Sequence, residues 1–497
     1  MGRSFGKQVG HYFGGQFLVQ IASFVSFPLF TRLLGPALYG LMGTVNSAVQ
    51  LVMPFAKCGM SNATERLYAE HRARGEEQAF FVTTRIFSLL WALGLVLALE
   101  ALLAAFVFLV PHAWVPETSP FRHLARLGML VGPLVFAKSQ LAVMLQVVRA
   151  RQETLYFNGV TTLETYLSLG LSVGFLFFFK RGLEALFLGQ TAASTLVLVA
   201  VLVHLTRQMP LDRKLYRRAM VKEALQFGTP LIWNEVSAVI GAFADRFVIL
   251  ALLDERALGI YQVGAGLAFT LLQVTAQPLE YAVGPVVFQR WADGGEAKVR
   301  ELLEPVARWT LRLMMPMLAG IQAVAEPLIV LMSGDAYRES ANILRLNFFA
   351  SLFWGVTSTI AIAVLIAKRT RLKRNVVWFA TGANVALAIV LVPRFGIQGA
   401  AYAFVASILA SCGYLCLVAY RILPMRIWGL YLLPSIAASV GMYLAVAWID
   451  LRTPVLTLLA RVVGGAVVFP VLLLALDGEA RRELRPILSK LRARLGR

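Results

Sequence analysis

Residues 80–110 read FFVTTRIFSLLWALGLVLALEALLAAFVFLV, an apolar run of 31 residues whose only charges are Arg85 and Glu100. A helix needs about 20 apolar residues to cross a bilayer, so this stretch predicts a membrane-spanning helix. The whole chain of 497 residues has the same character, since 58% of it is hydrophobic, 15% is charged and the mean hydropathy is +0.70. Soluble domains are less apolar and more charged. The composition therefore predicts an all-α polytopic membrane protein.

Similar apolar runs, bounded by proline, glycine or charge, recur along the chain. At about 20 residues per helix, the hydrophobic residues are enough for roughly 14 membrane helices. Fourteen runs can be drawn, at about 10–33, 38–60, 80–110, 125–147, 157–179, 183–205, 226–251, 258–286, 309–332, 342–366, 376–393, 399–420, 429–449 and 455–476. The first run contains Gln16 and Gln20 and shows no small-residue cleavage site, so we expect a retained helix and not a signal peptide.

The distribution of charge predicts the orientation of these helices. The chain has 47 Lys and Arg against 27 Asp and Glu, a net charge of +20. With a cytoplasmic N-terminus, 33 of the cations fall in cytoplasmic segments and nine in outer loops. Cations concentrate on the cytoplasmic side of membrane proteins, so both termini are predicted to be cytoplasmic. The excess charge then reflects topology and not a nucleic-acid partner, and the basic tail is predicted to be an amphipathic helix on the anionic leaflet.

The segments that connect the runs are too short to hold a further domain. None exceeds about 22 residues, including the connection between the second and third runs, and the chain has no GxxxxGK[ST] phosphate-binding loop. We therefore expect a protein that is not an enzyme, with no catalytic residues, no metal site and no cofactor.

Faint internal similarity indicates a duplicated unit. ALYG (37–40) is echoed by ALGIY (257–261), and GLEA (182–185) is echoed by GIQG (396–399). Two copies of six helices would share one orientation, related by an axis along the membrane normal; chance similarity in a Leu/Ala/Gly-rich chain is the alternative. The predicted organisation is two six-helix lobes, two further helices and the basic cytoplasmic tail, with boundaries 1–206, 207–424, 425–476 and 477–497.

Ionisable residues at membrane depth are candidate functional residues, because burying their charge is costly. The cations are Lys57, Lys138, Arg246, Arg312, Arg345 and Arg461, and the acids are Glu100, Glu164, Glu235, Asp245 and Glu280. At 1.5 Å per residue, Lys138 lies roughly 15 Å deep and Glu164 and Glu235 roughly 10 to 14 Å deep. These three could line one central cavity, or form a buried pair that only locks the helices. The cations that could snorkel from helix ends are Lys57, Arg312, Arg345 and Arg461. Asp245–Arg246 could be an interfacial anchor or a pair that stabilises its own helix.

The stretch FPLFTRLLGPALYGL (27–41) resembles the signature that opens the Wzx-type polysaccharide flippases of the MOP superfamily. Further similar pieces follow in the expected order, namely FGTPL (227–231), DRF (245–247), LGIY (258–261), GDAY (334–337) and GIQGAA (396–401). The resemblance spans most of the chain. It implies two six-helix bundles around a central cationic cavity, working by alternating access.

Members of this family move polyprenyl-pyrophosphate-linked oligosaccharide across the bacterial cytoplasmic (inner) membrane for O-antigen, capsule or exopolysaccharide biosynthesis, often with H⁺ or Na⁺ coupling. Buried cations suit the binding of pyrophosphate. The resemblance implies cargo binding by Lys138, Lys57, Arg246, Arg312 and Arg345, and ion coupling by Glu164, Glu235, Asp245 or Glu280. The implied partners are the lipid-linked oligosaccharide, membrane lipids, a polysaccharide polymerase and chain-length proteins.

Two other functions are considered. A MATE-like cation-coupled exporter of small molecules would favour acidic cavity residues and twelve helices, whereas Lys138 and fourteen runs point away from it. A membrane-embedded polymerase or glycosyltransferase would need a large outer loop with catalytic residues, and the longest outer segment, near 111–122, holds only Glu117 and Arg122. The two extra helices resemble those of lipid II flippases. Those flippases carry several arginines in their first two helices, whereas the first two runs here carry only Arg32 and Lys57. This difference favours an oligosaccharide cargo.

Overall fold

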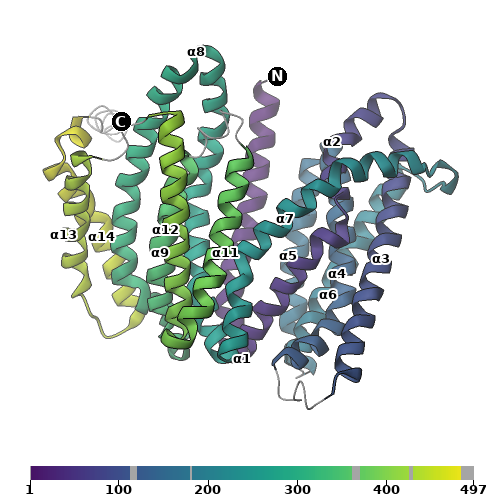
Figure 1. Cartoon of the computed structure of the whole chain (residues 1–497), viewed down its shortest axis with the longest axis horizontal. Helices are drawn as coiled ribbons and strands as arrows, with labels where there is room; N and C mark the ends of the chain where they lie inside the picture. Colours follow the sequence, from purple (N-terminus) through teal and green to yellow (C-terminus); the bar gives the residue numbers. More distant parts are fainter. Residues whose placement is uncertain (1, 112–119, 180–181, 361–369, 425–428, 483–497) are drawn as a thin grey trace, which may run out of the picture. The chain divides into compact units, whose positions relative to one another are not determined.

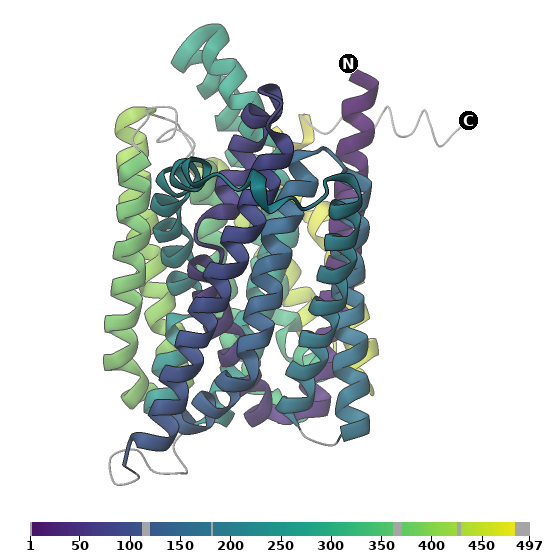
Figure 2. The ribbon, with the colours of Figure 1, turned by 90° about the vertical axis from the view of Figure 1, so that its right-hand side faces the viewer.

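The computed structural model describes residues 2–111, 120–179, 182–360, 370–424 and 429–482; within them, the side chains of some helical stretches, among them 2–17 and 274–282, are not described. The described chain is almost entirely helical and contains no strand (Figures 1 and 2). Within these ranges, nine helices are long and apolar enough to cross a membrane. The prediction of an all-α polytopic membrane protein is therefore confirmed.

The predicted runs fall on the helices, although some helices extend well beyond them: the helix Arg218–Leu252 begins eight residues before the run at 226, and the helical backbone resumes after Gly295, well before the run at 309. Residues 361–366 of the tenth run lie outside the described residues. The helices are α1 (Gly2–Lys57), α2 (Met60–Ala73), α3 (Glu77–Leu109), α4 (Pro120–Ala150), α5 (Thr154–Phe179), α6 (Leu183–Gln208), α7 (Arg218–Leu252), α8 (Glu255–Ser333), α9 (Ser340–Ile360), α11 (Thr370–Phe395), α12 (Ile397–Ile422), α13 (Leu433–Ala447) and α14 (Pro454–Leu476). Short 3₁₀ turns lie at Arg213–Leu215, Asp335–Tyr337 and Leu430–Leu432.

The helices α1 and α8 each carry two predicted runs, joined at a break in the helical backbone. In α1 the break is Gly35, with φ 69° and ψ 174°, a conformation that costs glycine little. Pro36 follows and cannot donate to the helical hydrogen-bond ladder. In α8 the break is at Gly294 and Gly295. Both breaks fall in the gaps that the sequence places between apolar runs.

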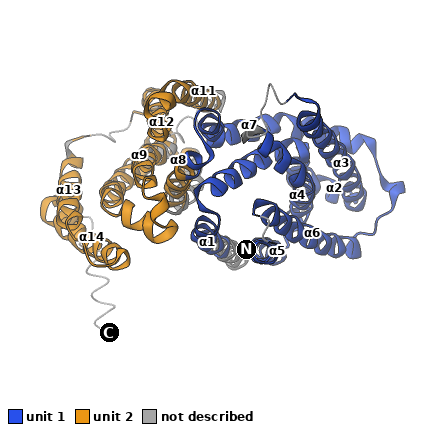
Figure 3. Ribbon diagram, turned by 90° about the horizontal axis from the view of Figure 1, so that it is seen from below, with its two compact units in different colours: residues 1–259 blue, residues 260–497 orange. Residues whose placement is uncertain are grey.

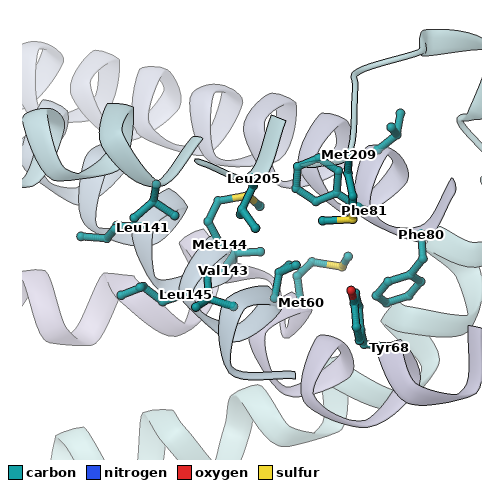
Figure 4. Close-up of a cluster of buried hydrophobic side chains, with 14 of the residues drawn as sticks. Met60, Tyr68, Phe80, Phe81, Leu141, Val143, Met144, Leu145, Leu205 and Met209 are labelled. Carbon is teal, nitrogen blue, oxygen red and sulfur yellow. The ribbon is translucent and has the colours of Figure 1, made fainter. Parts of the chain in front are cut away.

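Residues 1–259 form one compact unit, drawn in blue in Figure 3. Within it α5 packs on α6, α4 packs on α3 and α6, and α1 packs on α4 and α5. One buried apolar cluster joins α2, α3, α4 and α6 and includes Phe81 and Met144 (Figure 4). A second joins α1, α4 and α6 through Leu41, Leu134 and Phe187. In a lipid environment such helices are held by close packing, because lipid is as apolar as their side chains.

Residues 260–497 form the second compact unit, drawn in orange in Figure 3. Here α11 packs on α12, α12 packs on α9, and α13 packs on α14. Met442 of α13 and Phe469 and Leu473 of α14 form a small buried cluster, against which Trp309 of α8 packs. The last two predicted helices are thus anchored on the second half of α8.

Helix α2 lies where the sequence analysis expects only a connection. Its buried residues recur every three or four positions, at Met60, Ala63, Thr64, Leu67, Tyr68 and His71. This period places them on one face of the helix, and that face packs on α4 and α7. The segment between the first two runs and the third is therefore an ordered amphipathic helix.

The first compact unit includes α7, because α7 packs on α1, α2 and α3. The unit therefore extends beyond residue 206, where the predicted first lobe ends. The lobes 1–206 and 207–424 are defined by the internal repeat, and the duplication stays a prediction. Most of the predicted amphipathic tail, from residue 483 onward, lies outside the described residues.

Candidate functional site

Two of the candidate residues meet at one end of the contact between α1 and α7. Nζ of Lys57 donates to Oε2 of Glu235 at 2.6 Å, and Nδ2 of Asn62, in α2, donates to Oε1 of the same carboxylate at 2.8 Å. The side chains of Lys57 and Glu235 are 17% and 30% exposed. One carboxylate thus links α1, α2 and α7, and its charge is balanced by one ammonium group.

A close approach of two glycines brings these side chains together. Gly59 immediately precedes α2 and Gly228 lies in α7. A Cβ on either residue would overlap the backbone of the other. Gly59 also has φ 69°, which L residues with a side chain rarely adopt. Only glycine at both positions allows the two backbones to touch, two residues from Lys57 and two helical turns from Glu235.

Arg246 makes a second polar contact between α7 and α1. Its Nη1 donates to Oγ of Ser47 at 2.9 Å and to the carbonyl oxygen of Gly43 at 3.3 Å, and its guanidinium lies 4.5 Å from the ring centre of Phe243. The neighbouring Asp245 is buried, and its Oδ1 accepts from the backbone N–H of Arg246. Arg246, one of the two residues that could form an interfacial anchor, thus contacts α1 inside the first unit.

Lys138 lies near the middle of α4, 12 residues before its C-terminal end, or roughly 18 Å along the axis. Gln140, two positions later, exchanges hydrogen bonds with Ser88 of α3. Two positions correspond to about 200° of helical rotation, so Lys138 lies on the side of α4 away from Ser88. Leu134 and Leu141, one turn before and after Lys138, are buried in the two apolar clusters. Lys138 therefore lies on a protein-facing side of α4.

Lys138 is half-buried, and no described residue provides it with a counter-ion or a hydrogen-bond partner. No ion pair or hydrogen bond within the described part of the chain joins it to Glu164 or Glu235, the two acids expected to share its cavity. Glu164, in α5, instead accepts a hydrogen bond from Oγ of Ser194 in α6 at 2.9 Å. A part-buried Lys–Glu pair is present, but it joins Lys57 to Glu235 and does not involve Lys138.

The candidate arginines of the second unit have partners within that unit. Arg312 is 1% exposed and lies 3.2 Å from Asp477 and 2.8 Å from Glu479. Arg345 donates to Oδ1 of Asn342 at 2.9 Å and to a backbone carbonyl. Both arginines lie in the second unit, whereas Lys138, Lys57 and Arg246 lie in the first, and the cargo site proposed below is built on the cations of the first unit.

Two further candidates are Arg461 and Glu280. Arg461 donates to the backbone carbonyl oxygens of Ile449 and Ala323. Glu280 lies on α8 in a stretch whose side chains are outside the described residues. In the parts of the chain that are described, no group of three His, Cys, Asp or Glu side chains is placed to hold a metal ion.

A polar network around α2 was not among the candidates. Nδ1 of His71 lies 3.2 Å from Glu76 and its Nε2 lies 3.3 Å from Glu223 of α7, while Arg217 donates to Glu76. The hydrogen bond with His71, and then that from Arg217, hold the pKa of Glu76 below its ordinary value. A histidine on the apolar face of an amphipathic helix is the sequence signal that could have identified this network.

The chain is similar to a known protein family in sequence and to solved structures in fold. Residues 5–291 match the family model of polysaccharide biosynthesis proteins. No curated protein matches the chain in sequence. The fold is similar to that of the lipid II flippase MurJ in an inward closed conformation, with a TM-score of 0.73 and 15% identity over 96% of this chain and 99% of that one.

Two MATE transporters also share the fold. An inward-facing multidrug resistance MATE transporter of the MOP superfamily gives a TM-score of 0.64 at 14% identity, covering 82% of this chain and 98% of that one. The Vibrio cholerae MATE transporter VcmN in its bent form gives 0.54 at 13% identity, covering 85% and 98%. At such identities the likeness concerns fold alone. The family match covers more than half of the sequence, so the chain belongs to the polysaccharide biosynthesis protein family.

Proposed function

We propose that this protein is a flippase that moves a polyprenyl-pyrophosphate-linked oligosaccharide across the bacterial inner membrane by alternating access. The family match and the MOP-type transporter fold support a role in the export of polysaccharide precursors. The observation that carries the proposal is Lys138, a cation near the middle of a membrane helix for which the described residues supply no counter-ion.

An ammonium group in this position favours an anionic ligand. Burying a charge without a partner is costly, and the middle of α4 is too far from either helix end for a lysine to reach water by snorkelling. A phosphate group satisfies the ammonium through charge-assisted hydrogen bonds. The polyprenyl tail of such a cargo can remain in lipid while the pyrophosphate contacts Lys138.

Lys57, Arg246 and the carboxylates complete the proposed mechanism. Protonation of Glu235 would remove the charge that holds Lys57 and would free its ammonium group for the cargo phosphate. Binding of H⁺ would then be linked to binding of the anion. Glu164, Asp245 and Glu280 remain proposed coupling residues, for H⁺ or Na⁺.

The proposed orientation has both termini in the cytoplasm, as the distribution of cations indicates. In this orientation the cargo is loaded at the inner leaflet and released at the outer one. A polymerase and chain-length proteins that use the exported repeat unit are the proposed partners.

The direct test replaces Lys138 in a strain whose surface polysaccharide depends on this gene. Lys138→Ala is expected to reduce export at least tenfold, while Lys138→Arg keeps the cation and retains partial export. Lys222→Ala, at an exposed lysine near the start of α7, is the matched control and is expected to export normally. Unchanged polysaccharide with Lys138→Ala at normal protein level would contradict the proposed cargo site.

A second test addresses coupling. Collapse of the proton and sodium gradients in proteoliposomes should abolish concentrative transport of the cargo. If transport does not depend on either gradient, the coupling role proposed for the carboxylates is contradicted. The proposal of the cargo site is not affected by that result.

A further inference from the structure

A pocket of about 440 Å³ lies inside the first compact unit. Its walls come from the second half of α1 (residues 44–52), from α3 (96–106) and from α4 (124–135), and Phe247 of α7 contributes one side chain. The described lining is almost wholly apolar and includes no Lys or Arg. Its volume lies within the range of about 300–1,000 Å³ that is typical of small-molecule sites.

The single charged residue in this lining is Glu100. Its Oε1 atom is buried and has no hydrogen-bond partner among the described residues. Glu100 is nine residues from the Leu109 end of α3, or about 14 Å along the helix axis, which is well inside a hydrocarbon layer about 30 Å thick. The carboxyl group is therefore remote from bulk water.

The glycine opposite Glu100 makes room for the carboxyl group. A Cβ on residue 132 would overlap Oε1 of Glu100. By contrast, a Cβ on Gly128, one turn earlier in α4, would meet only the end of the flexible Leu103 side chain, with Cδ1 nearest at 3.0 Å. Gly132 therefore holds Glu100 against the α4 backbone, where its oxygen borders the pocket.

An ionised carboxylate in apolar surroundings is unfavourable unless a cation approaches it, and without one the group takes up a proton. A metal ion does not suit a site with one carboxylate and almost no other oxygen, because Mg²⁺ and Ca²⁺ take six or more oxygen ligands. An organic cation with an apolar body suits it, because the apolar walls take the body while Glu100 balances the charge. We propose that this pocket binds an amphiphilic organic monocation, with Glu100 as its counter-ion.

This site differs from the proposed cargo site in the charge of the ligand that it would bind. The cargo proposed above is an anion held by Lys138, whereas this pocket offers one carboxylate in an apolar lining. The two proposals can therefore fail separately. The cation is expected to act as a second ligand of the first unit.

The test uses the purified full-length protein in detergent and two ions of nearly the same shape and opposite charge. Equilibrium dialysis with radiolabelled tetraphenylphosphonium is expected to show saturable binding above that of protein-free micelles. Tetraphenylborate is expected to show none, because its negative charge opposes Glu100. The comparison separates recognition of the cation from simple partition of an apolar body.

Four variants locate the binding. Glu100→Gln removes the charge, and Gly132→Ala displaces it. Each variant is expected to weaken tetraphenylphosphonium binding about tenfold or more, because the cation loses a charge partner that contributes roughly 1.4 kcal/mol or above. Two variants are matched controls. Gly128→Ala changes the same pocket, and Glu70→Gln removes the same charge from the exposed side of α2. Each should change the affinity for tetraphenylphosphonium by less than about threefold, or roughly 0.7 kcal/mol.

A conservative variant distinguishes the loss of the charge from misfolding. Glu100→Asp keeps the carboxylate and is expected to retain more binding than Glu100→Gln, with both eluting as monodisperse protein. The proposal is overturned if the wild-type protein shows no saturable binding of tetraphenylphosphonium, if tetraphenylborate binds equally well, or if Glu100→Gln leaves the affinity unchanged.

Discussion

The ammonium group of Lys57 lies 2.6 Å from a carboxylate oxygen of Glu235, a residue 178 positions away in the sequence. Asn62 occupies the second oxygen of the same carboxylate. Through these two contacts Glu235 connects the end of α1, the start of α2 and the middle of α7. The stability and the proposed ion coupling of the first unit both depend on this junction.

Breaking the pair of Lys57 and Glu235 on one side is expected to destabilise the protein. Lys57→Met leaves a partly buried carboxylate without its cation, which costs about 1–3 kcal/mol, between the values for surface and buried pairs. The variant Glu235→Gln should cost a similar amount, and the double variant should cost less than the sum. Thermal melting of the purified variants measures all three. A double loss equal to the sum would show that the two side chains do not interact.

The contact of Gly59 with Gly228 should tolerate no side chain. In Gly228→Ala the new Cβ meets the backbone of Gly59 and not a flexible side chain, so a loss of about 1–3 kcal/mol is expected from overpacking. Gly94→Ala in α3 is the matched control, because no described heavy atom lies within 4 Å of its Cβ position. It should be neutral or slightly stabilising, as for Gly→Ala in a helix interior. Equal melting temperatures for the two variants would contradict the close approach.

Arg312 should be structural in the second unit. Its side chain is almost fully buried beside Asp477, which is 3% exposed. Removing one partner of a buried pair costs about 3–5 kcal/mol, so Arg312→Ala is expected to lower the melting temperature strongly. Arg338→Ala is the control, since its pair with Asp335 is exposed and is worth about 1 kcal/mol or less. An Arg312→Ala protein that melts like the wild type would refute this role.

Glu76 predicts a pH dependence of stability. Its pKa is lowered in the folded protein by hydrogen bonds with His71 and Arg217, so folding favours the ionised form. The resulting stabilisation is present above the ordinary carboxyl pKa of 4.5 and is lost as the pH falls through the lower folded-state pKa. The wild type should therefore melt higher than Glu76→Gln at neutral pH, and the difference should vanish in acid. A difference that is constant from neutral to acid pH would rule this out.

The sequence predicted the membrane helices well because hydrophobic length is a local property. A run of about 20 apolar residues spans the bilayer whatever its neighbours are, and the gaps between runs contained the breaks at Gly35 and Gly294–Gly295. Helix α2 was not predicted, because a division into apolar runs does not detect a segment whose mean hydropathy is polar. Its buried residues at every third or fourth position were nevertheless readable.

The charged candidates were also readable, since an ionisable residue within an apolar run stands out. The residues that pair with these candidates could not be predicted from the sequence. Lys57, Arg312 and Arg345 were grouped with Lys138 as cargo-binding cations, yet the structure gives the first three partners inside the protein, while the described residues offer Lys138 none. Glu100 was noted as one acid among several, and only the pocket beside Gly132 distinguishes it.

By itself the sequence determined the membrane class, the approximate helix ends and the set of charges that lie at membrane depth. Tertiary structure alone decided which of those charges are neutralised. The physical reason is that electrostatic interaction depends on distance in space, and the backbone contact between Gly59 and Gly228 sets the distance between Lys57 and Glu235. No local pattern around either residue contains that contact.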